Sequence, residues 1–219
     1  MENSFKGRKV LITAGPTYEH IDPVRFIGNH STGKMGFALA ECFAQRGAKV
    51  QLVAGPTHMK AQHPSVKVTD VTTADEMYEA VKQLAAKSDI WVFAAAVADY
   101  KPKVAADRKI KKAGAELTLE LVKNVDIAAA LGKEKREDQF SVGFALETDN
   151  ESSNAREKLL KKNLDMIVLN SLNDPGAGFK HDTNKITIIE RDTTTAFELK
   201  QKSEVAQDIV NLIGERLYA

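Results

Sequence analysis

The sequence predicts an α/β fold: a Rossmann-like, three-layer, mostly parallel sheet with a β-hairpin or flap excursion and an antiparallel C-terminal strand pair. Short apolar runs alternate with amphipathic helical patterns, which is typical of a parallel sheet covered by helices on both faces. A basic stretch in the middle of the chain has no helical pattern. Two short strand-like runs precede a final helical pattern, and they predict the closing antiparallel pair.

These patterns define the expected elements. Strands of the parallel sheet are expected at 9–14, 50–55, 66–71, 90–98, 141–146 and 166–170. Helices are expected at 35–46, 74–86, 151–163 and 203–217. The run at 90–98 is the most apolar, so we place it near the centre of the sheet. The antiparallel pair is expected at 185–189 and 195–199.

Residues 99–123 break the strand–helix alternation. They are predicted to form a loop, a short basic strand, a turn at Ala113–Gly114 and a second strand. We interpret residues from about 100 to 123 as a flap or dimerisation arm. The whole chain, 1–219, is expected to be a single domain.

The composition limits the classes of function. The 219 residues include 31 Lys and Arg against 30 Asp and Glu, a net charge of +1, which gives no argument for a nucleic-acid or membrane partner. Cys42 is the only cysteine, so no internal disulfide can form, and its helical context predicts a buried thiol. No run approaches 18 apolar residues and the N-terminal residues contain no apolar signal segment, so we expect a soluble, cytoplasmic protein.

Ligands of parallel sheets bind where loops leave the carboxyl ends of the strands. That rule selects residues 14–34, 95–112, 124–127, 144–149 and 170–180. GNHSTGK fits the phosphate-loop pattern, but Met35 replaces the Ser or Thr that would hold magnesium, so we exclude a P-loop NTPase. Gly33 and Gly36 at the predicted helix start still indicate anion binding by a helix N-terminus.

The segment also resembles the opening of a short-chain dehydrogenase. The insert Gly15–Ser31 and the lack of an acidic residue after the second strand argue against NAD. Within the insert, Arg25 suits a phosphate or carboxylate, and Asn29 can donate to a developing oxyanion. His30 is interpreted as a hydrogen-bonded loop residue, and Asp22–Pro23 is expected to set a turn.

A second group of candidates follows the central strand. Small residues, including Ala95 and Ala96, let a ligand approach the backbone, and Asp99 is a candidate magnesium ligand or ribose partner. The basic residues that follow are Lys101, Lys103, Arg108, Lys109, Lys111 and Lys112. A charge run is usually a solvated surface, but this one lies at the predicted ligand edge, where a triphosphate is its natural partner.

Later segments add further candidates. Asn124 or Asp126 can cap a helix that follows a strand. Phe144 ends another strand and is either a core residue or a ligand contact. Lys158 and Lys162, spaced i,i+4, share one helix face, which is either solvent-facing or directed at the ligand edge.

Taken in order, GPTYEHIDPVRFIGNHSTGKMG, AAAVADYKPK, KIKK, KNVDI, GFALET and KKNLDMIVLN resemble the bacterial phosphopantothenate–cysteine ligases over essentially the whole chain. In many bacteria such a domain follows a flavin-dependent phosphopantothenoylcysteine decarboxylase domain, which this sequence lacks. The resemblance implies a homodimer that uses CTP and Mg²⁺. The 4′-phosphopantothenate carboxylate would form an acyl-cytidylate with release of pyrophosphate, and the amine of L-cysteine would then expel CMP.

The resemblance also implies roles for individual residues. Lys109 corresponds to the family lysine of cytidylate formation, and Asn29 to the asparagine that handles the acyl-cytidylate, with Arg25 beside it. Val125 stands where the family pattern leads us to expect proline. The implied nucleotide- and substrate-binding residues are Asp99, Asn124, Val125, Asp126, Ile127, Phe144, Lys158, Lys162, Ala95, Ala96, Gly15, Ser31, Gly33 and Lys112, with Asp99 also the candidate metal ligand.

Two alternatives stay open from the sequence. An NADP-dependent short-chain reductase would need a Tyr-x-x-x-Lys pair, and only Tyr78 with Lys82 fits, within a helical pattern that precedes the central strand. A non-catalytic nucleotide-binding dimer module would bind CTP without releasing pyrophosphate.

Overall fold

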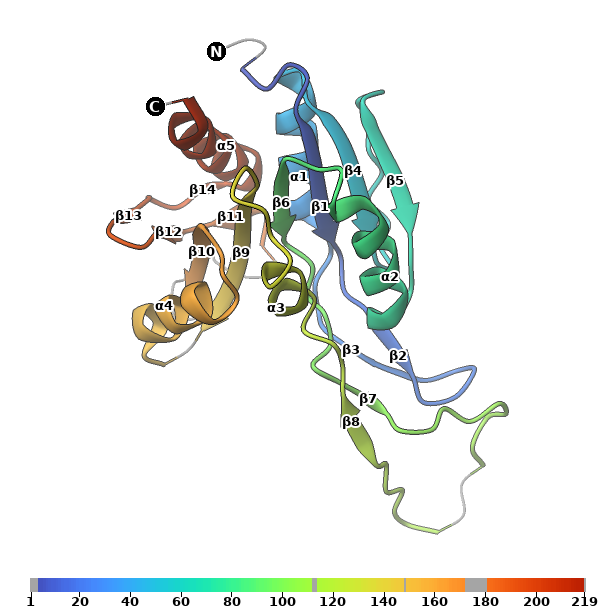
Figure 1. Ribbon diagram of the computed structural model, residues 1–219. Helices are drawn as coiled ribbons and strands as arrows, with labels where there is room; N and C mark the ends of the chain where they lie inside the picture. The colour runs from blue at the N-terminus through green and yellow to red at the C-terminus, as the bar shows by residue number, and fades with distance from the viewer. Residues whose placement is uncertain (1–3, 112–113, 148, 172–180, 219) are drawn as a thin grey trace.

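The computed structural model describes residues 4–111, 114–147, 149–171 and 181–218. An eight-stranded sheet with the order β13-β12-β10-β9-β6-β1-β4-β5 forms its centre (Figure 1). The parallel strands are β1 (Lys9–Ala14), β4 (Lys49–Ala54), β5 (Val66–Asp70), β6 (Ile90–Phe93), β9 (Phe140–Glu147) and β10 (Met166–Ser171). The predicted mostly parallel α/β sheet is therefore confirmed.

An antiparallel pair extends one edge of this sheet. β12 (Ile186–Ile189) pairs with β10, and β13 (Thr194–Ala196) pairs with β12, both antiparallel. Two further short strands, β11 (Thr183–Asn184) and β14 (Lys200–Gln201), pair with each other in a separate two-stranded sheet. The closing antiparallel pair predicted from the sequence is confirmed.

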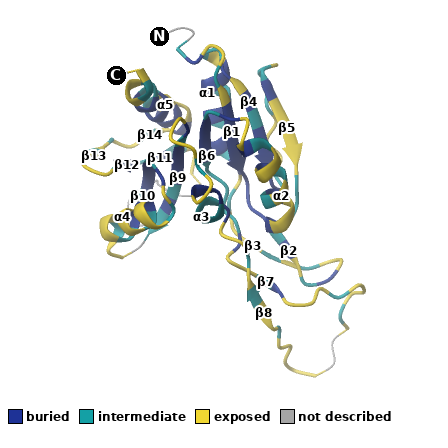
Figure 2. Cartoon of the chain, in the orientation of Figure 1, coloured by how far each residue is buried: buried dark blue, intermediate teal, exposed yellow. Residues whose placement is uncertain are grey.

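Helices cover both faces of the sheet. They are α1 (Lys34–Gln45), α2 (Ala74–Ala85), α3 (Ile127–Gly132), α4 (Glu151–Lys161) and α5 (Lys202–Tyr218). Alternate residues of β1 reach opposite cores, because Val10 and Ile12 pack in the cluster of α1 and α5, whereas Leu11 packs in that of α2 and α3. Figure 2 shows the resulting buried layer along the strands. Cys42 of α1 is buried, as predicted.

The central strand is shorter than the sequence suggested. β6 lies in the interior of the sheet, as predicted, but it ends at Phe93, and the expected continuation to residue 98 is wrong. Beyond Phe93 the backbone turns to the loop after β1: Ala96 N donates to Gly15 O at 2.9 Å. This departure exposes backbone atoms at the carboxyl edge of the sheet, which is where ligands bind in such folds.

An arm extends from that edge, away from the body of the molecule (Figure 1). Its base is an antiparallel pair, β7 (Tyr100–Pro102) with β8 (Leu121–Lys123), so the predicted hairpin excursion is confirmed. The predicted basic strand is wrong: residues 103–111 form no strand, and the second run is a strand only at Leu121–Lys123. Of the predicted turn, Gly114 has φ 107°, whereas Ala113 and Lys112 lie outside the described residues.

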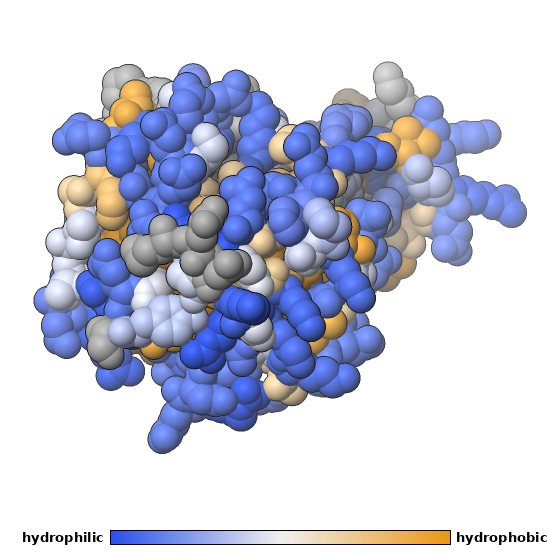
Figure 3. Space-filling model, turned by 90° about the horizontal axis from the view of Figure 1, so that it is seen from above, coloured by the Kyte–Doolittle hydropathy of each residue, from blue (hydrophilic) through white to orange (hydrophobic). Residues whose placement is uncertain are grey.

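The surface at the opposite end, near the two termini, is mostly hydrophilic with separate apolar areas (Figure 3). Within the described part of the chain, no helix is long and apolar enough to cross a bilayer.

Candidate functional site

A cavity of about 870 Å³ opens at the carboxyl edge of the sheet. Its size is typical of small-molecule sites. Its walls come from the ends of β1, β6 and β9, the start of α1, the base of the arm, and α3 and α4. The predicted residues that line it are Asn29, Ser31, Gly33, Ala95, Ala96, Asp99, Asn124, Val125, Asp126, Ile127, Phe144, Lys158 and Lys162.

The start of α1 forms one wall of the cavity. Gly33 precedes the helix with φ 81°, a left-handed conformation that favours glycine. A Cβ on Gly36 would lie 2.5 Å from the Cβ of Ala14, so only glycine lets the helix approach the end of β1 this closely. Gly15, also predicted to bind ligand, does not line the cavity; its φ of 78° and its close approach to Gly55 O serve packing.

Asn29 connects two walls of the cavity. Its Nδ2 donates to Ala96 O at 3.1 Å and to Val97 O at 3.2 Å. Both amide hydrogens are therefore in use in this state. Donation to a ligand oxyanion, as predicted for Asn29, requires the ligand to replace one of these carbonyl oxygens.

Arg25 lies outside the cavity and is held by Asp22. The Asp22 carboxylate is buried, accepts the Arg25 Nε and Nη2 at 3.0 and 2.5 Å, and also accepts the backbone N–H of Val24 and Ile110. The hydrogen bond from Arg25 keeps the pKa of Asp22 well below its ordinary range. The turn predicted at Asp22–Pro23 is present, and Asp22 has a second function that was not predicted.

That second function is to connect the first loop to the arm. Arg25 Nη2 donates to Ile110 O at 2.9 Å, and Ile110 N donates to Asp22. The first loop itself is more ordered than predicted, because β2 (Tyr18–His20) pairs with β3 (Phe26–Gly28). The ring centroids of Tyr18 and Phe26 lie 3.8 Å apart in a stacked arrangement.

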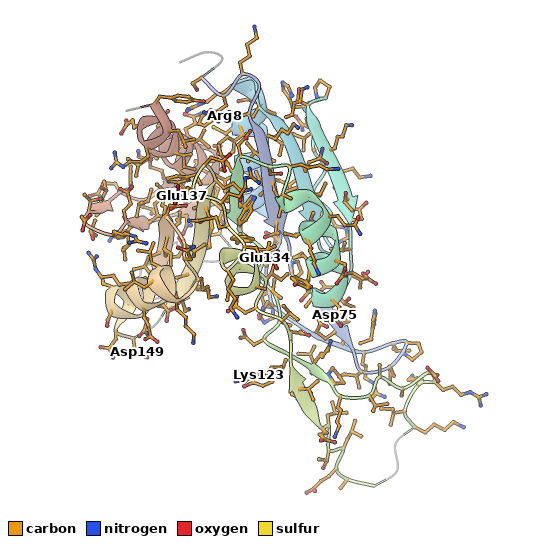
Figure 4. All side chains as sticks on the ribbon, viewed as in Figure 1. Arg8, Asp75, Lys123, Glu134, Glu137 and Asp149 are labelled. Carbon is orange, nitrogen blue, oxygen red and sulfur yellow. The ribbon has the colours of Figure 1, made fainter. Side chains whose placement is uncertain are left out.

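The described residues of the basic run of the arm do not line the cavity, and Lys112 lies outside the described residues. Lys109 is exposed and does not line it. Lys101 pairs with Asp75 of α2, and Lys103 pairs with Glu120 across the arm at 2.7 Å. Lys123, in contrast, lines the cavity at the base of the arm (Figure 4). The predicted concentration of basic residues at the ligand edge is thus not found among the described residues of that run, to which Lys123 did not belong.

Lys158 of α4 and Lys162, the residue that caps the end of α4, both line the cavity, and each has a carboxylate partner. Lys162 Nζ lies 2.9 Å from Asp126 Oδ2, and Lys158 pairs with Glu147. Asp126 also caps α3, since its Oδ1 accepts the backbone N–H of Ala129 at 3.1 Å, as predicted. The shared helix face is directed at the cavity, and a nucleotide binding there would compete for ammonium groups that are already paired.

Several cavity residues had no role predicted from the sequence, namely Lys34, Lys123, Lys161, Asn170, Asn184 and Lys202. Lys34 directly follows Gly33, so a lysine after the glycine of a helix start was the available signal. Lys202 and Asn184 come from the last fifth of the chain, and no local pattern connects them with the first loop.

The described residues include no group of three His, Cys, Asp or Glu side chains placed to hold a metal ion. Mg²⁺ bound with a nucleotide usually needs only one or two carboxylates besides the phosphates. Asp99 and Asp126 both line the cavity. The carboxylates of the described residues therefore fit a magnesium ion that arrives with a triphosphate, and within that part of the chain none are grouped to hold a metal by protein alone.

The Tyr-x-x-x-Lys pair required by a reductase lies elsewhere. Tyr78 and Lys82 are on α2, with the ammonium 5.7 Å from the ring centroid, and neither lines the cavity. This placement removes the Tyr-x-x-x-Lys pair as an argument for the reductase.

Comparisons with known proteins agree with this arrangement. Residues 5–217 match the family model described as DNA/pantothenate metabolism flavoprotein C-terminal domain. The chain is 53% identical, over 97% of its length, to a cysteine/cysteine sulfinic acid decarboxylase from an unknown prokaryotic organism, and 46% identical, over 98%, to the coenzyme A biosynthesis bifunctional protein CoaBC of Haemophilus influenzae. It covers 59% and 53% of those two relatives, respectively.

A solved structure matches at full length. The crystal structure of the C-terminal domain of a coenzyme A biosynthesis bifunctional protein CoaBC superposes with a TM-score of 0.83 at 40% identity. The match covers 99% of this chain and 98% of that one.

Proposed function

The chain belongs to the DNA/pantothenate metabolism flavoprotein C-terminal domain family, and from that premise we propose that it is a phosphopantothenate–cysteine ligase of coenzyme A biosynthesis. The observation that carries the proposal is the convergence of separate motifs on one cavity. The first loop, the segment after β6, the start of α3, the end of β9 and the face of α4 all contribute residues that the family resemblance assigned to the substrates.

The proposed reaction has two steps. A carboxylate oxygen of 4′-phosphopantothenate attacks the α-phosphorus of CTP, and pyrophosphate leaves with the electron pair of the broken P–O bond. The amine of L-cysteine then attacks the acyl carbon, the C–O bond to CMP breaks, and the amine loses a proton. Both steps depend on orientation and charge stabilisation more than on an acid–base pair.

The cavity residues have roles that match these needs. The nucleotide is proposed to contact α3 through residues 124–127, with Phe144, Lys158 and Lys162 beside it. Asn29 donates to the oxyanion that forms when cysteine attacks. Mg²⁺ would neutralise phosphate charge, and Asp99 is the side chain that would hold it.

Lys109 and Arg25 do not line the cavity of a single chain, and both are nevertheless proposed to take part in the reaction. Arg25, four residues before Asn29, contacts both Asp22 of the first loop and Ile110 of the arm. These contacts hold the first loop and the arm together. The arm exposes Tyr100, Val104 and Leu121, apolar side chains that a second copy could cover. A homodimer joined through the arms is therefore part of the proposal, as is cytoplasmic location.

The partners follow from the relatives. Because the chain spans 59% and 53% of the relatives compared above, a flavin-dependent phosphopantothenoylcysteine decarboxylase is proposed as a fused or separate partner. It would consume the product of this ligase.

The experiment is pyrophosphate release from CTP with Mg²⁺ and 4′-phosphopantothenate, with and without L-cysteine, and with ATP in parallel. Release that needs phosphopantothenate, faster with CTP than with ATP, and amide product only with cysteine would support the proposal. CTP binding without any release would favour the non-catalytic module. Carbon dioxide formed from cysteine alone would instead favour the activity named for one relative.

A further inference from the structure

Residues 96–98, called the wall segment below, line the cavity just beyond the end of β6. They belong to no helix and to no strand of the main sheet, so contacts from other parts of the chain must hold them. Asn29 donates to the first two carbonyl oxygens of the segment, and Asn124 Nδ2 donates to the third at 2.8 Å. The position of the Asn29 amide therefore depends on where the wall segment lies.

Thr17 holds the wall segment without lining the cavity itself. Its Oγ1 accepts the backbone N–H of Ala98 at 3.0 Å, and its own N–H donates to Ala96 O at 3.4 Å. Thr17 is completely buried, and a β-branched side chain has few χ1 rotamers, so its oxygen points in one fixed direction. Thr17 thus holds both ends of the wall segment.

Thr17 also contacts the strand that leads to Asn29. Gly28 is the last residue of β3 and directly precedes Asn29, and a Cβ on Gly28 would lie 2.9 Å from Thr17 O. That distance leaves no room for a side chain, so the backbone at the end of β3 packs directly on Thr17. Asn29 and the carbonyl oxygens that it binds are therefore both positioned against one residue.

The two residues after Thr17 attach it to the body of the molecule. Tyr18 N donates to Thr72 O at 2.8 Å. The buried carboxylate of Glu19 accepts the N–H of Ala74, the first residue of α2, at 2.9 Å, which is a favourable place for a negative charge. These contacts fix Thr17 to α2 and to the loop before it.

The hydroxyl group is the part of Thr17 that the wall segment needs. Ala98 is only 5% exposed, so its N–H has little access to solvent if that hydroxyl is removed. A buried donor without an acceptor is costly, and the segment is expected to shift until the N–H finds another acceptor. Such a shift moves the carbonyl oxygens that hold Asn29.

We propose that Thr17 is a positioning residue for Asn29, acting through the wall segment and the end of β3 without touching a ligand. This inference rests on the proposed function, in which Asn29 stabilises the oxyanion formed when cysteine attacks the acyl carbon. Loss of the Thr17 hydroxyl therefore affects amide formation more than pyrophosphate release. The proposed magnesium ligand Asp99 keeps a separate attachment, because Asn124 N donates to Asp99 O at 2.9 Å.

The first test compares the two half-reactions in variants of Thr17. Thr17→Val keeps the shape of the side chain and loses the acceptor, so amide formation should fall by about 10- to 100-fold, the effect of a slightly displaced catalytic group. Pyrophosphate release without cysteine should stay within about threefold of the unmodified chain, since its groups keep their positions. Thr17→Ser retains the oxygen and should restore amide formation.

Ser88→Ala is the matched control for the loss of a buried hydroxyl. Ser88 is 1% exposed, precedes the opposite end of β6, and donates its hydroxyl to Leu84 O at 3.0 Å. Its removal costs stability in the same way but leaves the wall segment untouched. Both half-reactions should therefore run at the rates of the unmodified chain.

A measurement without turnover separates this inference from the proposed function. The NMR signal of the Asn29 side-chain amide, identified by its absence in Asn29→Asp, should shift in Thr17→Val and stay in place in Thr17→Ser and Ser88→Ala. That shift supports the inference even in a chain that makes no amide product, a result that would refute the proposed function alone. Thr17→Ala removes the hydroxyl without adding a methyl group, and it decides the question if Thr17→Val does not fold. An unshifted Asn29 signal, or equal losses in the two half-reactions, would overturn the inference.

Discussion

The cavity is walled by the ends of buried strands, whereas the arm that leaves the same edge of the sheet exposes most of its side chains (Figure 2). Among the cavity residues, Phe144 lies in β9 of the sheet, and Asn124 donates its Nδ2 to Ala98 O at 2.8 Å. Lys109 depends instead on a two-strand base and on the contacts of Asp22 with Arg25 and Ile110. The body of one chain thus positions the binding groups, while the arm adds a group whose position depends on few contacts.

The largest expected effect tests the arm. Lys109→Ala should reduce pyrophosphate release by about 10²–10³-fold, because a positioned cation at a transition-state charge contributes that much. Stopped-flow detection of pyrophosphate gives the rate. Lys103→Ala, which removes an exposed lysine of the same arm paired with Glu120, is the control. Unchanged release by Lys109→Ala would show that the arm acts only in assembly.

The next effect tests the cavity wall. Asn29→Asp removes the donor hydrogens that now bind Ala96 O and Val97 O. Pyrophosphate release should persist, while amide formation should fall by about 10²–10³-fold. Mass spectrometry of quenched reactions should then find accumulated acyl-nucleotide. Amide formation at the normal rate would remove Asn29 from the second step, and His30→Gln, an exposed neighbour, serves as the comparison.

A smaller effect tests the contact between loop and arm through pH. The pKa of Asp22 is depressed in the fold, so its stabilising contribution is present above the ordinary carboxyl pKa of about 4 and is lost as pH falls below it. The melting temperature of the unmodified chain should therefore fall more between pH 6 and pH 3 than that of Asp22→Asn. Equal falls would mean that the Asp22–Arg25 pair does not stabilise the fold.

The smallest effect concerns the partly exposed pair Lys162–Asp126. Lys162→Ala should change the free energy of unfolding by less than about 1 kcal/mol, since such pairs contribute little. Its CTP affinity should nevertheless fall, because the ammonium faces the cavity. Urea unfolding and CTP titration on the same preparation measure the two quantities. A large stability loss with unchanged CTP affinity would assign Lys162 a structural role.

The sequence predicted what local patterns determine. The helix that starts after Gly33, the cap at Asp126 and the shared face of Lys158 and Lys162 each depend on residues within a few positions of one another. The prediction of a basic strand in the arm was wrong. A strand needs a pairing partner, and residues 103–111 have none among the described residues.

Other features depend on tertiary contacts that no short motif encodes. The local sequence at Asp22 predicts only a turn, whereas its carboxylate accepts a hydrogen bond from the backbone N–H of Ile110, 88 positions away in the sequence. Lys202 meets Lys34 only because β11 and α5 return to the start of α1. Such residues are found by assembling the fold.

The central claim is that the carboxylate is activated as an acyl-nucleotide in this cavity, and an oxygen-transfer measurement tests it most directly. Phosphopantothenate labelled with ¹⁸O in its carboxylate is incubated with CTP, Mg²⁺, L-cysteine and the unmodified chain, and the products are analysed by mass spectrometry. The account predicts one ¹⁸O atom in CMP and none in pyrophosphate. Label in inorganic phosphate, with CDP as the nucleotide product, would show activation through an acyl phosphate and would contradict it.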